Sequence, residues 1–205
     1  MPHLSSSYSE NVSTLDRLLR VRESFDIIKK PLQVGSDEVT FYYIDGFVKD
    51  GVMQKLMLSF TSLKDLGDKH LQGFACANDF LCKRVVYVES ELTDSLDTMI
   101  QMVLSGATLM IGSRFGEYGI IIDSRSYPAR ETTEPQNDRV MRGPRDGFVE
   151  TLISNTALIR RRVRNTALTM SYFTVGKSSK TDVVLCFMAD RADAQYVKRV
   201  SERLK

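Results

Sequence analysis

Apolar residues recur along this chain with two spacings, which divide it into predicted helices and strands. A spacing of three or four residues, typical of helices with one buried face, occurs at residues 12–25, 50–60, 92–104, 147–166 and 192–204. Short runs rich in apolar and β-branched residues predict strands at residues 27–34, 39–44, 85–88, 107–111, 119–122, 170–175 and 182–188. Residues 1–12 follow neither spacing, and we expect them to form a flexible tail.

Turn-forming residues separate several of these strands and predict hairpins. Gly35-Ser36-Asp37 lies between the first two strands, and Pro31 predicts that the first of them is an edge strand. The runs at 107–111 and 119–122 flank Gly112 and Gly116, which predicts a second hairpin. Residues 124–137 have no apolar period and contain two prolines, so we expect a loop or linker there.

The order strand, turn, strand, helix occurs twice. It runs from residue 34 into the helix at 50–60, and again from residue 175 into the helix at 192–204. This order is common in α/β folds, but the repeat favours two similar lobes. We therefore predict an α/β fold with two lobes, each a small mixed β-sheet flanked by helices, with the second lobe incomplete. The predicted divisions are the tail at 1–12, a first lobe at 13–135, a turn and connecting helix at 136–166, and the start of a second lobe at 167–205.

Composition limits the classes of function. The 205 residues carry a formal net charge of +2, whereas dedicated nucleic-acid binders usually have a strongly basic face. We therefore expect no nucleic-acid partner. The first residues contain no apolar core of a signal peptide, and no window approaches the roughly 18 uncharged apolar residues that span a bilayer. We expect this chain by itself to be soluble.

The cysteines and histidines predict no cofactor, metal or catalytic site. The three cysteines are Cys76, Cys82 and Cys186, an odd number without a Cys-x-x-Cys pair, which disfavours a disulfide framework. His70 lies near two of them in sequence, but the spacing matches no standard zinc site. No nucleophile elbow or zinc-protease motif occurs. We expect no enzymatic activity.

Residues 139–150, which we call the arginine motif, concentrate charge around one turn. Arg142 and Arg145 flank Gly143-Pro144 just before a predicted helix. Two guanidinium groups beside a helix N-terminus suit a carboxylate or phosphate. The alternative, which the residues alone favour, is that both arginines pair with Glu134, Asp138 or Glu150 and fix the linker on a lobe.

Two further basic groups are candidate interaction surfaces. Arg160, Arg161, Arg162 and Arg164 fall in the last turns of a predicted helix, where the dipole favours cations. A solvated helix end explains them, and attraction to anionic lipid is the alternative. Lys177 and Lys180 lie in a turn that lacks the spacing of a phosphate loop and joins two strands. This turn is predicted to be a charged hairpin tip that faces a partner.

The arginine motif resembles the Arg-Gly-Pro-Arg-(Asp/Glu)-Gly-Phe-Val-Glu sequence of the A subunits of GerA-type spore germinant receptors. Further similar segments are residues 43–46, 156–164 and 174–183, so the resemblance covers most of the chain from residue 16. Residues 60–84 are less typical of the family. The motif residues to which the resemblance gives a structural or partner-contact role are Arg139, Arg142, Gly143, Pro144, Arg145, Asp146, Gly147, Phe148 and Glu150.

The resemblance implies a soluble, two-lobed domain that precedes membrane helices, which in the family lie beyond the position of Lys205. It implies a location at the spore inner membrane, with this portion facing the cytosol. The expected partners are the receptor B and C subunits and further copies of the A subunit. The expected role is subunit assembly and signal transmission to a membrane channel in nutrient-triggered germination. The alternatives are a module that binds a small nutrient between its lobes and a phosphate-handling enzyme that uses Arg142 and Arg145.

Overall fold

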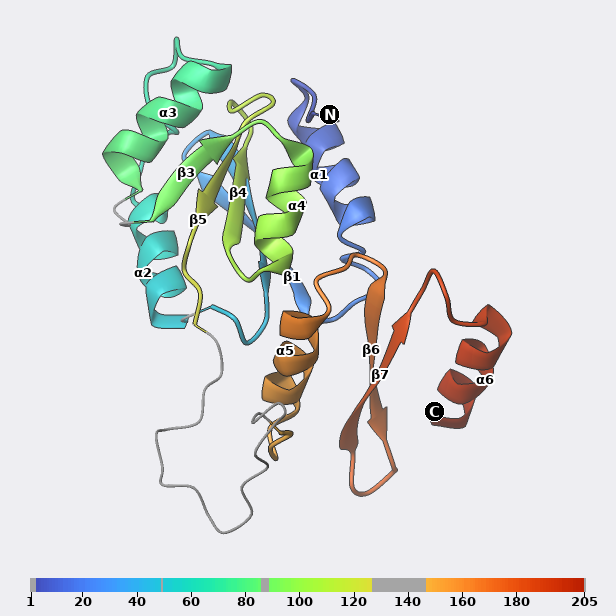
Figure 1. Ribbon diagram of the computed structural model, residues 1–205. Coiled ribbons are helices and arrows are strands. Elements are labelled where there is room, and N and C mark those ends of the chain that lie inside the picture. The colour runs from blue at the N-terminus through green and yellow to red at the C-terminus, as the bar shows by residue number, and fades with distance from the viewer. Residues whose placement is uncertain (1–2, 49, 86–88, 127–146, 205) are drawn as a thin grey trace, which may run out of the picture.

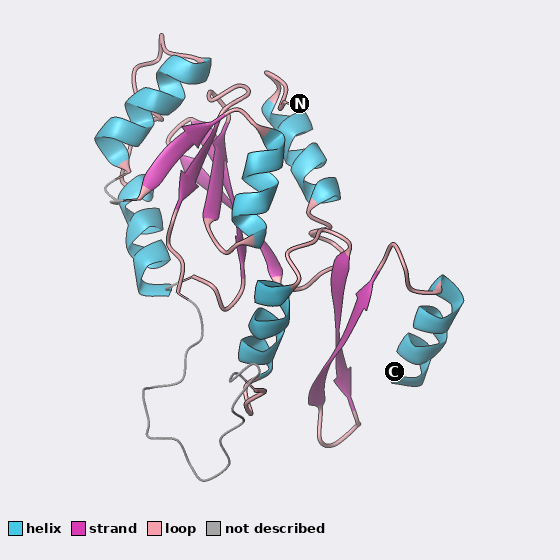
Figure 2. Ribbon diagram, in the orientation of Figure 1, coloured by secondary structure: helices cyan, strands magenta, loops and turns pink. Residues whose placement is uncertain are grey.

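The structure, a computed structural model, describes residues 3–48, 50–85, 89–126 and 147–204 (Figure 1). The described chain forms two lobes of helices and strands, as Figure 2 shows by colour. The first lobe has a five-stranded sheet and the second a two-stranded one. This confirms the predicted α/β class with two lobes. All described strand pairs are antiparallel, so neither sheet is of the mixed type that we predicted.

The first sheet has the strand order β1-β2-β4-β5-β3. Its strands are β1 Ile27–Val34, β2 Asp37–Ile44, β3 Ser90–Thr93, β4 Thr108–Gly112 and β5 Gly119–Ile122. Both predicted hairpins, β1–β2 and β4–β5, are present. β1 lies at one edge of the sheet, as Pro31 predicted, because a proline cannot donate to a strand on that side.

Helices cover both faces of this sheet and create two apolar cores. Helices α1 Tyr8–Leu18 and α4 Leu96–Leu104 bury Leu15, Met99 and other side chains on one face. Helices α2 Asp50–Thr61 and α3 Gly73–Arg84 bury Phe60, Phe80 and other side chains on the opposite face. Figure 1 shows the two helix pairs on either side of the strands. The first lobe is therefore a sandwich of three layers.

The second lobe consists of α5 Leu152–Arg162, the hairpin of β6 Leu168–Val175 and β7 Thr181–Met188, and α6 Ala194–Leu204. This hairpin and this terminal helix were both predicted. In contrast to the first lobe, α6 buries none of its described residues, and the apolar side chains of β7 are only half-buried.

Several boundaries differ from the predictions. The described part of the predicted tail packs on the lobe: Leu4 is buried and α1 already begins at Tyr8. Leu92 belongs to β3, and α4 starts only after Ser95, whose hydroxyl accepts a hydrogen bond from the Thr98 N–H at 3.3 Å. The predicted helix at 147–166 is shorter, since α5 begins at Leu152. Helix α3 was not predicted, and of the strand predicted at 85–88 only Val85 lies within the described residues.

No helix in the described part of the chain is both long enough and apolar enough to cross a membrane.

Candidate functional site

The two lobes meet at a buried guanidinium group, that of Arg160 on α5, which is 0% exposed. Its Nε donates to Asp26 Oδ2 at 2.7 Å, and its Nη2 donates to Asp26 Oδ1 at 3.0 Å. The same group donates to the carbonyl oxygens of Asn165 at 3.1 Å and Leu168 at 3.0 Å. The guanidinium therefore joins the segment before β1 in the first lobe to the start of β6 in the second.

Ser24 completes this contact, which we call the interlobe joint: Ser24, Asp26, Arg160, Leu168 and Met170. The Ser24 hydroxyl donates to Asp26 Oδ1 at 2.7 Å and accepts from Arg160 Nη2 at 3.2 Å and from the Met170 N–H at 3.0 Å. The N–H of Phe25 donates to the Met170 carbonyl at 3.0 Å. A hydroxyl has one donor and two acceptor sites, so Ser24 uses all three.

The joint is a buried ion pair whose polar atoms are satisfied. Among the described residues, no buried side-chain nitrogen or oxygen lacks a hydrogen-bond partner. Desolvating two charges is costly, so such a pair adds little net stability, but removing one partner leaves a buried charge and costs about 3–5 kcal/mol. The joint therefore fixes the geometry between lobes more than it contributes to their stability.

Helix α5 also packs directly on the turn after β2. A Cβ built on Gly46 would lie 3.0 Å from Ile153 Cγ2 and 3.3 Å from the Ala157 Cβ, and the φ angle of Gly46 is +79°. This left-handed conformation favours glycine, and the missing side chain lets the helix approach. Beside the joint, the ring centroids of Phe25 and Tyr172 lie 5.7 Å apart, which adds an aromatic contact between the segment before β1 and β6. Backbone, aromatic and ionic contacts thus hold α5 and β6 against the first lobe (Figure 1).

Arg160 corrects one sequence-based expectation. We placed it with Arg161, Arg162 and Arg164 on an exposed basic surface, but its side chain is buried and committed to Asp26. The other three arginines are exposed. No local pattern distinguishes Arg160 from its neighbours, because its partners Ser24 and Asp26 lie more than a hundred residues earlier.

The two basic groups do not form one surface. The exposed arginines lie where α5 ends, just before β6 begins, whereas Lys177 and Lys180 are exposed in the turn at the far end of the β6–β7 hairpin. An eight-residue strand separates them, which corresponds to about 26 Å at ~3.3 Å per residue. Any partner contacts at these two places are separate contacts.

Most of the arginine motif lies outside the described residues. This applies to Arg139, Arg142, Gly143, Pro144, Arg145 and Asp146, and also to the predicted acidic partners Glu134 and Asp138. Gly147, Phe148 and Glu150 are described, and all three are exposed ahead of α5. The predicted pairing of the motif arginines therefore stays a prediction.

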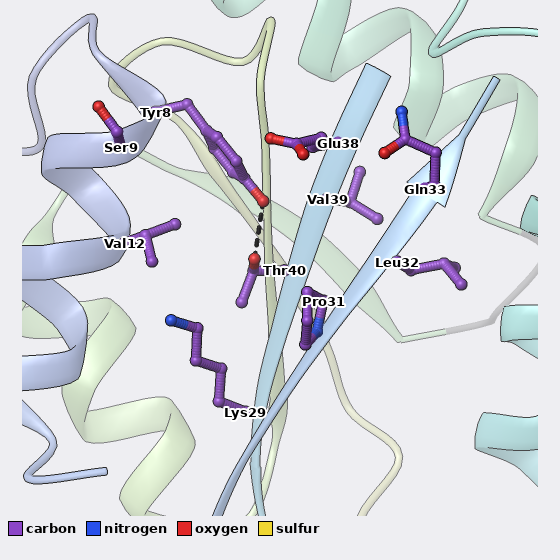
Figure 3. A pocket seen from close by; sticks show the side chains of 10 residues that line it. All are labelled: Tyr8, Ser9, Val12, Lys29, Pro31, Leu32, Gln33, Glu38, Val39 and Thr40. Carbon is purple, nitrogen blue, oxygen red and sulfur yellow. Dashed lines mark hydrogen bonds between the residues drawn. The ribbon is translucent and has the colours of Figure 1, made fainter. Parts of the chain in front are cut away.

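A groove in the first lobe lies between α1 and the β1–β2 hairpin, with a volume of about 430 Å³ (Figure 3). The Tyr8 hydroxyl lies 2.7 Å from Thr40 Oγ1 across it, and burial raises the pKa of Tyr8. Lys29 also lines the groove and pairs with Asp16 at 2.7 Å. A second groove, of about 390 Å³, adjoins it along α1. Both lie within the first lobe and not between the lobes.

Neither thiol chemistry nor metal binding is suggested by the described residues. Burial raises the pKa values of Cys76 and Cys186, so both thiols are held in the protonated, less nucleophilic form. Within the described ranges, no three His, Cys, Asp or Glu side chains are grouped so that they could hold a metal ion.

Comparison with known proteins places the chain in a family. Residues 14–205 match the family model described as Bacillus/Clostridium GerA spore germination protein. Stage V sporulation protein AF of Bacillus subtilis is 33% identical over 181 residues, which are 88% of this chain and 36% of that protein. Spore germination protein B1 of Bacillus subtilis is 25% identical over 202 residues, 98% of this chain and 41% of that protein.

The fold also matches a solved domain. The crystal structure of the N-terminal domain of the A subunit of the Bacillus megaterium spore germinant receptor GerK3 superposes with a TM-score of 0.74 at 21% identity. The match covers 100% of this chain and 73% of that domain. The chain spans less than half the length of stage V sporulation protein AF and of spore germination protein B1. On the residues matched, this chain belongs to the GerA family of spore germination proteins.

Proposed function

We propose that this chain is the N-terminal domain of the A subunit of a spore germinant receptor, which acts in nutrient-triggered germination by subunit assembly and signal transmission to a membrane channel. Membership of the GerA family and the fold of the GerK3 domain support this proposal. The expected partners are the B and C subunits and further A subunits. The receptor is expected at the spore inner membrane, with this domain on the cytosolic side.

The observation that carries the proposal is the interlobe joint. A domain that passes a conformational signal needs a mechanical link between its parts, and packed, fully hydrogen-bonded elements provide one. Arg160 and Ser24 tie β6 to the segment that leads into β1. A displacement of the second lobe therefore moves the edge strand of the first lobe, or breaks a buried ion pair. No bond-making chemistry is needed for this role.

The test replaces the ion pair in the full-length receptor and measures germination. The double variant Asp26→Leu with Arg160→Met removes both charges together, so it avoids leaving one unpaired charge buried. We expect the domain to stay folded and nutrient-triggered germination to slow at least roughly tenfold, because the polar contacts that orient the lobes are gone. Arg161→Met, at an exposed position of the same helix, is the matched control. Normal germination of the double variant at normal receptor abundance would refute signal transmission through the joint.

A second candidate function is direct binding of a small nutrient, and the groove along α1 favours it. The groove combines the apolar side chains of Val12 and Pro31 with the polar groups of Tyr8, Lys29 and Thr40 (Figure 3). The sequence-based alternative placed such a ligand between the lobes, whereas this groove lies within the first lobe. Calorimetric titration of the chain with amino acids, sugars and nucleotides tests it. Saturable binding that is lost in Thr40→Val would support this function, and no heat of binding would favour the assembly role.

A further inference from the structure

The groove of about 390 Å³ along α1 continues past the end of that helix, and we call it the α1-end groove. Three of the residues that line it are arginines: Arg17 in the last turn of α1, and Arg20 and Arg22 in the segment after the helix. The other lining residues are Ser9, Val12, Ser13, Asp16 and Glu23. Sites for small molecules have volumes of roughly 300–1,000 Å³. The groove is therefore large enough for a small ligand, and most of its charged side chains are cations.

The two carboxylates of the α1-end groove are already engaged. Asp16 Oδ2 accepts from Lys29 Nζ at 2.7 Å, and Asp16 Oδ1 accepts from the Tyr42 hydroxyl at 2.9 Å. Glu23 forms an ion pair with Arg20, three positions earlier. Each negative charge of the groove is thus balanced by one cation, and neither cation is one of the other two arginines.

Arg17 and Arg22 carry the charge that is left over. Among the residues that the structure describes, neither side chain has an ion-pair or hydrogen-bond partner, and both are exposed. The dipole of α1 favours a cation at the position of Arg17. Arg22 lies beyond the helix, so the dipole does not account for it. The groove therefore has two positive charges that no carboxylate of the described chain balances.

The backbone of the segment after α1 holds these arginines in a tight turn. Arg20 has a φ angle of 55°, in the left-handed region that residues with a Cβ seldom adopt. Its carbonyl oxygen accepts from the N–H groups of Glu23 at 2.9 Å and Ser24 at 3.0 Å. Strained backbone of this kind persists only where the surroundings hold it, and it is frequent at ligand sites. Residues 20–24 thus form one hydrogen-bonded turn with Arg22 at its centre.

The same turn also belongs to the interlobe joint. Ser24 ends the turn, and its hydroxyl accepts from Arg160 Nη2 and from the Met170 N–H. The next residue, Phe25, donates its N–H to the Met170 carbonyl, and Figure 1 shows the end of α1 beside the start of β6. Arg22 in the groove and Ser24 in the joint are two residues apart. A ligand that orders this turn therefore also orders the contact between the lobes.

The charge of the α1-end groove suits a phosphate group. Two unpaired guanidinium groups match an anion with two negative charges, and a phosphate monoester carries about −1.5 to −2 at pH 7. A single carboxylate would leave one guanidinium unbalanced. Ser13 precedes Arg17 by one turn on the same face of α1, and its hydroxyl is a further donor for a phosphate oxygen.

We propose that the α1-end groove binds the phosphate group of a small soluble molecule, that Arg17 and Arg22 hold this group, and that the bound ligand stabilises the interlobe joint. A ligand that binds the ordered turn better than the loosened one shifts the equilibrium towards the closed joint by its ratio of affinities. The regulatory role of the site rests on the proposed function, in which the joint passes the signal. Binding itself does not depend on that function.

Calorimetric titration of the 205-residue protein with inorganic pyrophosphate tests the site. We expect saturable binding of one pyrophosphate per chain, and we expect Arg22→Gln or Arg17→Gln to weaken it at least roughly tenfold, because each removes a charge-assisted donor pair. Both side chains are exposed, so both variants should fold. Lys30→Gln is the matched control: Lys30 is an exposed cation on β1 that does not line the groove. It should change the affinity less than about threefold.

Amide hydrogen exchange tests the coupling to the joint. Saturating pyrophosphate should slow exchange of the Phe25 and Met170 amides at least about fivefold. The Lys180 amide, which donates within the turn of the β6–β7 hairpin, should not change. Both measurements are made without germination. Their failure is therefore distinct from failure of the proposed function, which germination of the Asp26→Leu, Arg160→Met variant decides.

Four results would overturn the proposal. The first is no saturable binding of pyrophosphate, and the second is equal affinity in wild type and Arg22→Gln. The third is binding that leaves exchange at Phe25 and Met170 unchanged. The fourth is binding to vesicles that contain phosphatidic acid, lost in Arg22→Gln, in a protein that does not bind pyrophosphate. That result would assign the phosphate to a lipid headgroup and not to a soluble molecule.

Discussion

The guanidinium group of Arg160 forms two hydrogen bonds with the carboxylate of Asp26 across 134 residues of sequence, and both side chains are buried. Paired, fork-to-fork contacts of this kind fix direction as well as distance. The same guanidinium group also donates hydrogen bonds to the carbonyl oxygens of Asn165 and Leu168 and to the hydroxyl of Ser24. Arg160 therefore fixes the direction of α5 against the first lobe, in addition to the packing of α5 on Gly46.

Arg160→Ala should destabilise the protein by about 3–5 kcal/mol, because it leaves the carboxylate of Asp26 buried without its cation. Arg161→Ala, one position further along α5 and exposed, should change the free energy of unfolding by less than about 0.5 kcal/mol. Urea denaturation of both variants measures the difference. Similar stabilities of the two variants would contradict the central role of the joint.

Gly35→Ala should cost at least about 2 kcal/mol of stability. Gly35 has a φ angle of +60°, and a Cβ there would lie 1.5 Å from the carbonyl oxygen of Lys64, so the loop that crosses the hairpin would have to move. The control is Gly51→Ala in α2, where a Cβ would meet no atom within 4 Å. Alanine suits a helix better than glycine does, so Gly51→Ala should be neutral or slightly stabilising. Equal thermal stabilities of the two variants would contradict this account.

The three thiols should react at different rates. Cys82 is exposed, whereas Cys76 is buried and Cys186 is half-buried. Burial raises the pKa of both covered thiols, and at Cys186 the carboxylate of Asp26 raises it further. Alkylation at about pH 8 should therefore modify Cys82 first, and Cys82→Ser should remove the fast phase. All three should react quickly in urea, and equal rates in the native protein would contradict the described burial.

The same pKa shifts predict how stability depends on pH. A thiol whose pKa is higher in the folded than in the unfolded state stabilises the fold in its protonated form. This contribution is complete below the unfolded pKa, roughly 8.5, and is lost as pH rises through the folded value. Urea midpoints should therefore fall at alkaline pH, and fall less in Cys186→Ala than in wild type. An unchanged pH profile of Cys186→Ala would contradict a role for that thiol.

Hairpins were the features that the sequence predicted best, because alternating or continuous apolar runs joined by glycine turns are local signals. Pro31 also marked the edge of the sheet from one residue. The start of α5 was misplaced because residues 147–151 continue its apolar spacing, although Thr151 precedes the helix in an extended conformation. Likewise, Leu92 fits the spacing of α4 but pairs with Ile120 in the sheet.

The joint could not be predicted, because nothing local distinguishes Arg160 from the arginines beside it. Its burial depends on Ser24 and Asp26, which lie more than a hundred residues earlier and are close to it only in the folded chain. The repeated order of strand, turn, strand and helix was visible in the sequence. It was not visible that Asn11 in α1 and Asn155 in α5 bind the backbone six residues earlier in the same way. Their backbone contacts become apparent only in the folded chain.

Charge reversal at the two basic groups should distinguish their roles in the full-length receptor. Arg161→Glu alters the exposed end of α5, and Lys180→Glu alters the tip of the β6–β7 hairpin, an eight-residue strand away. Because the two positions are distant from each other, we expect their effects on nutrient-triggered germination to combine independently, within the usual additivity of distant sites.

Both side chains are exposed, so each variant domain should keep its melting temperature within about 2 °C of the wild-type value. If an acidic neighbour or anionic lipid contacts these groups, each reversal should slow germination, and higher salt should weaken the contact in wild type. Normal germination of the double variant at normal receptor abundance would exclude both groups as contact sites.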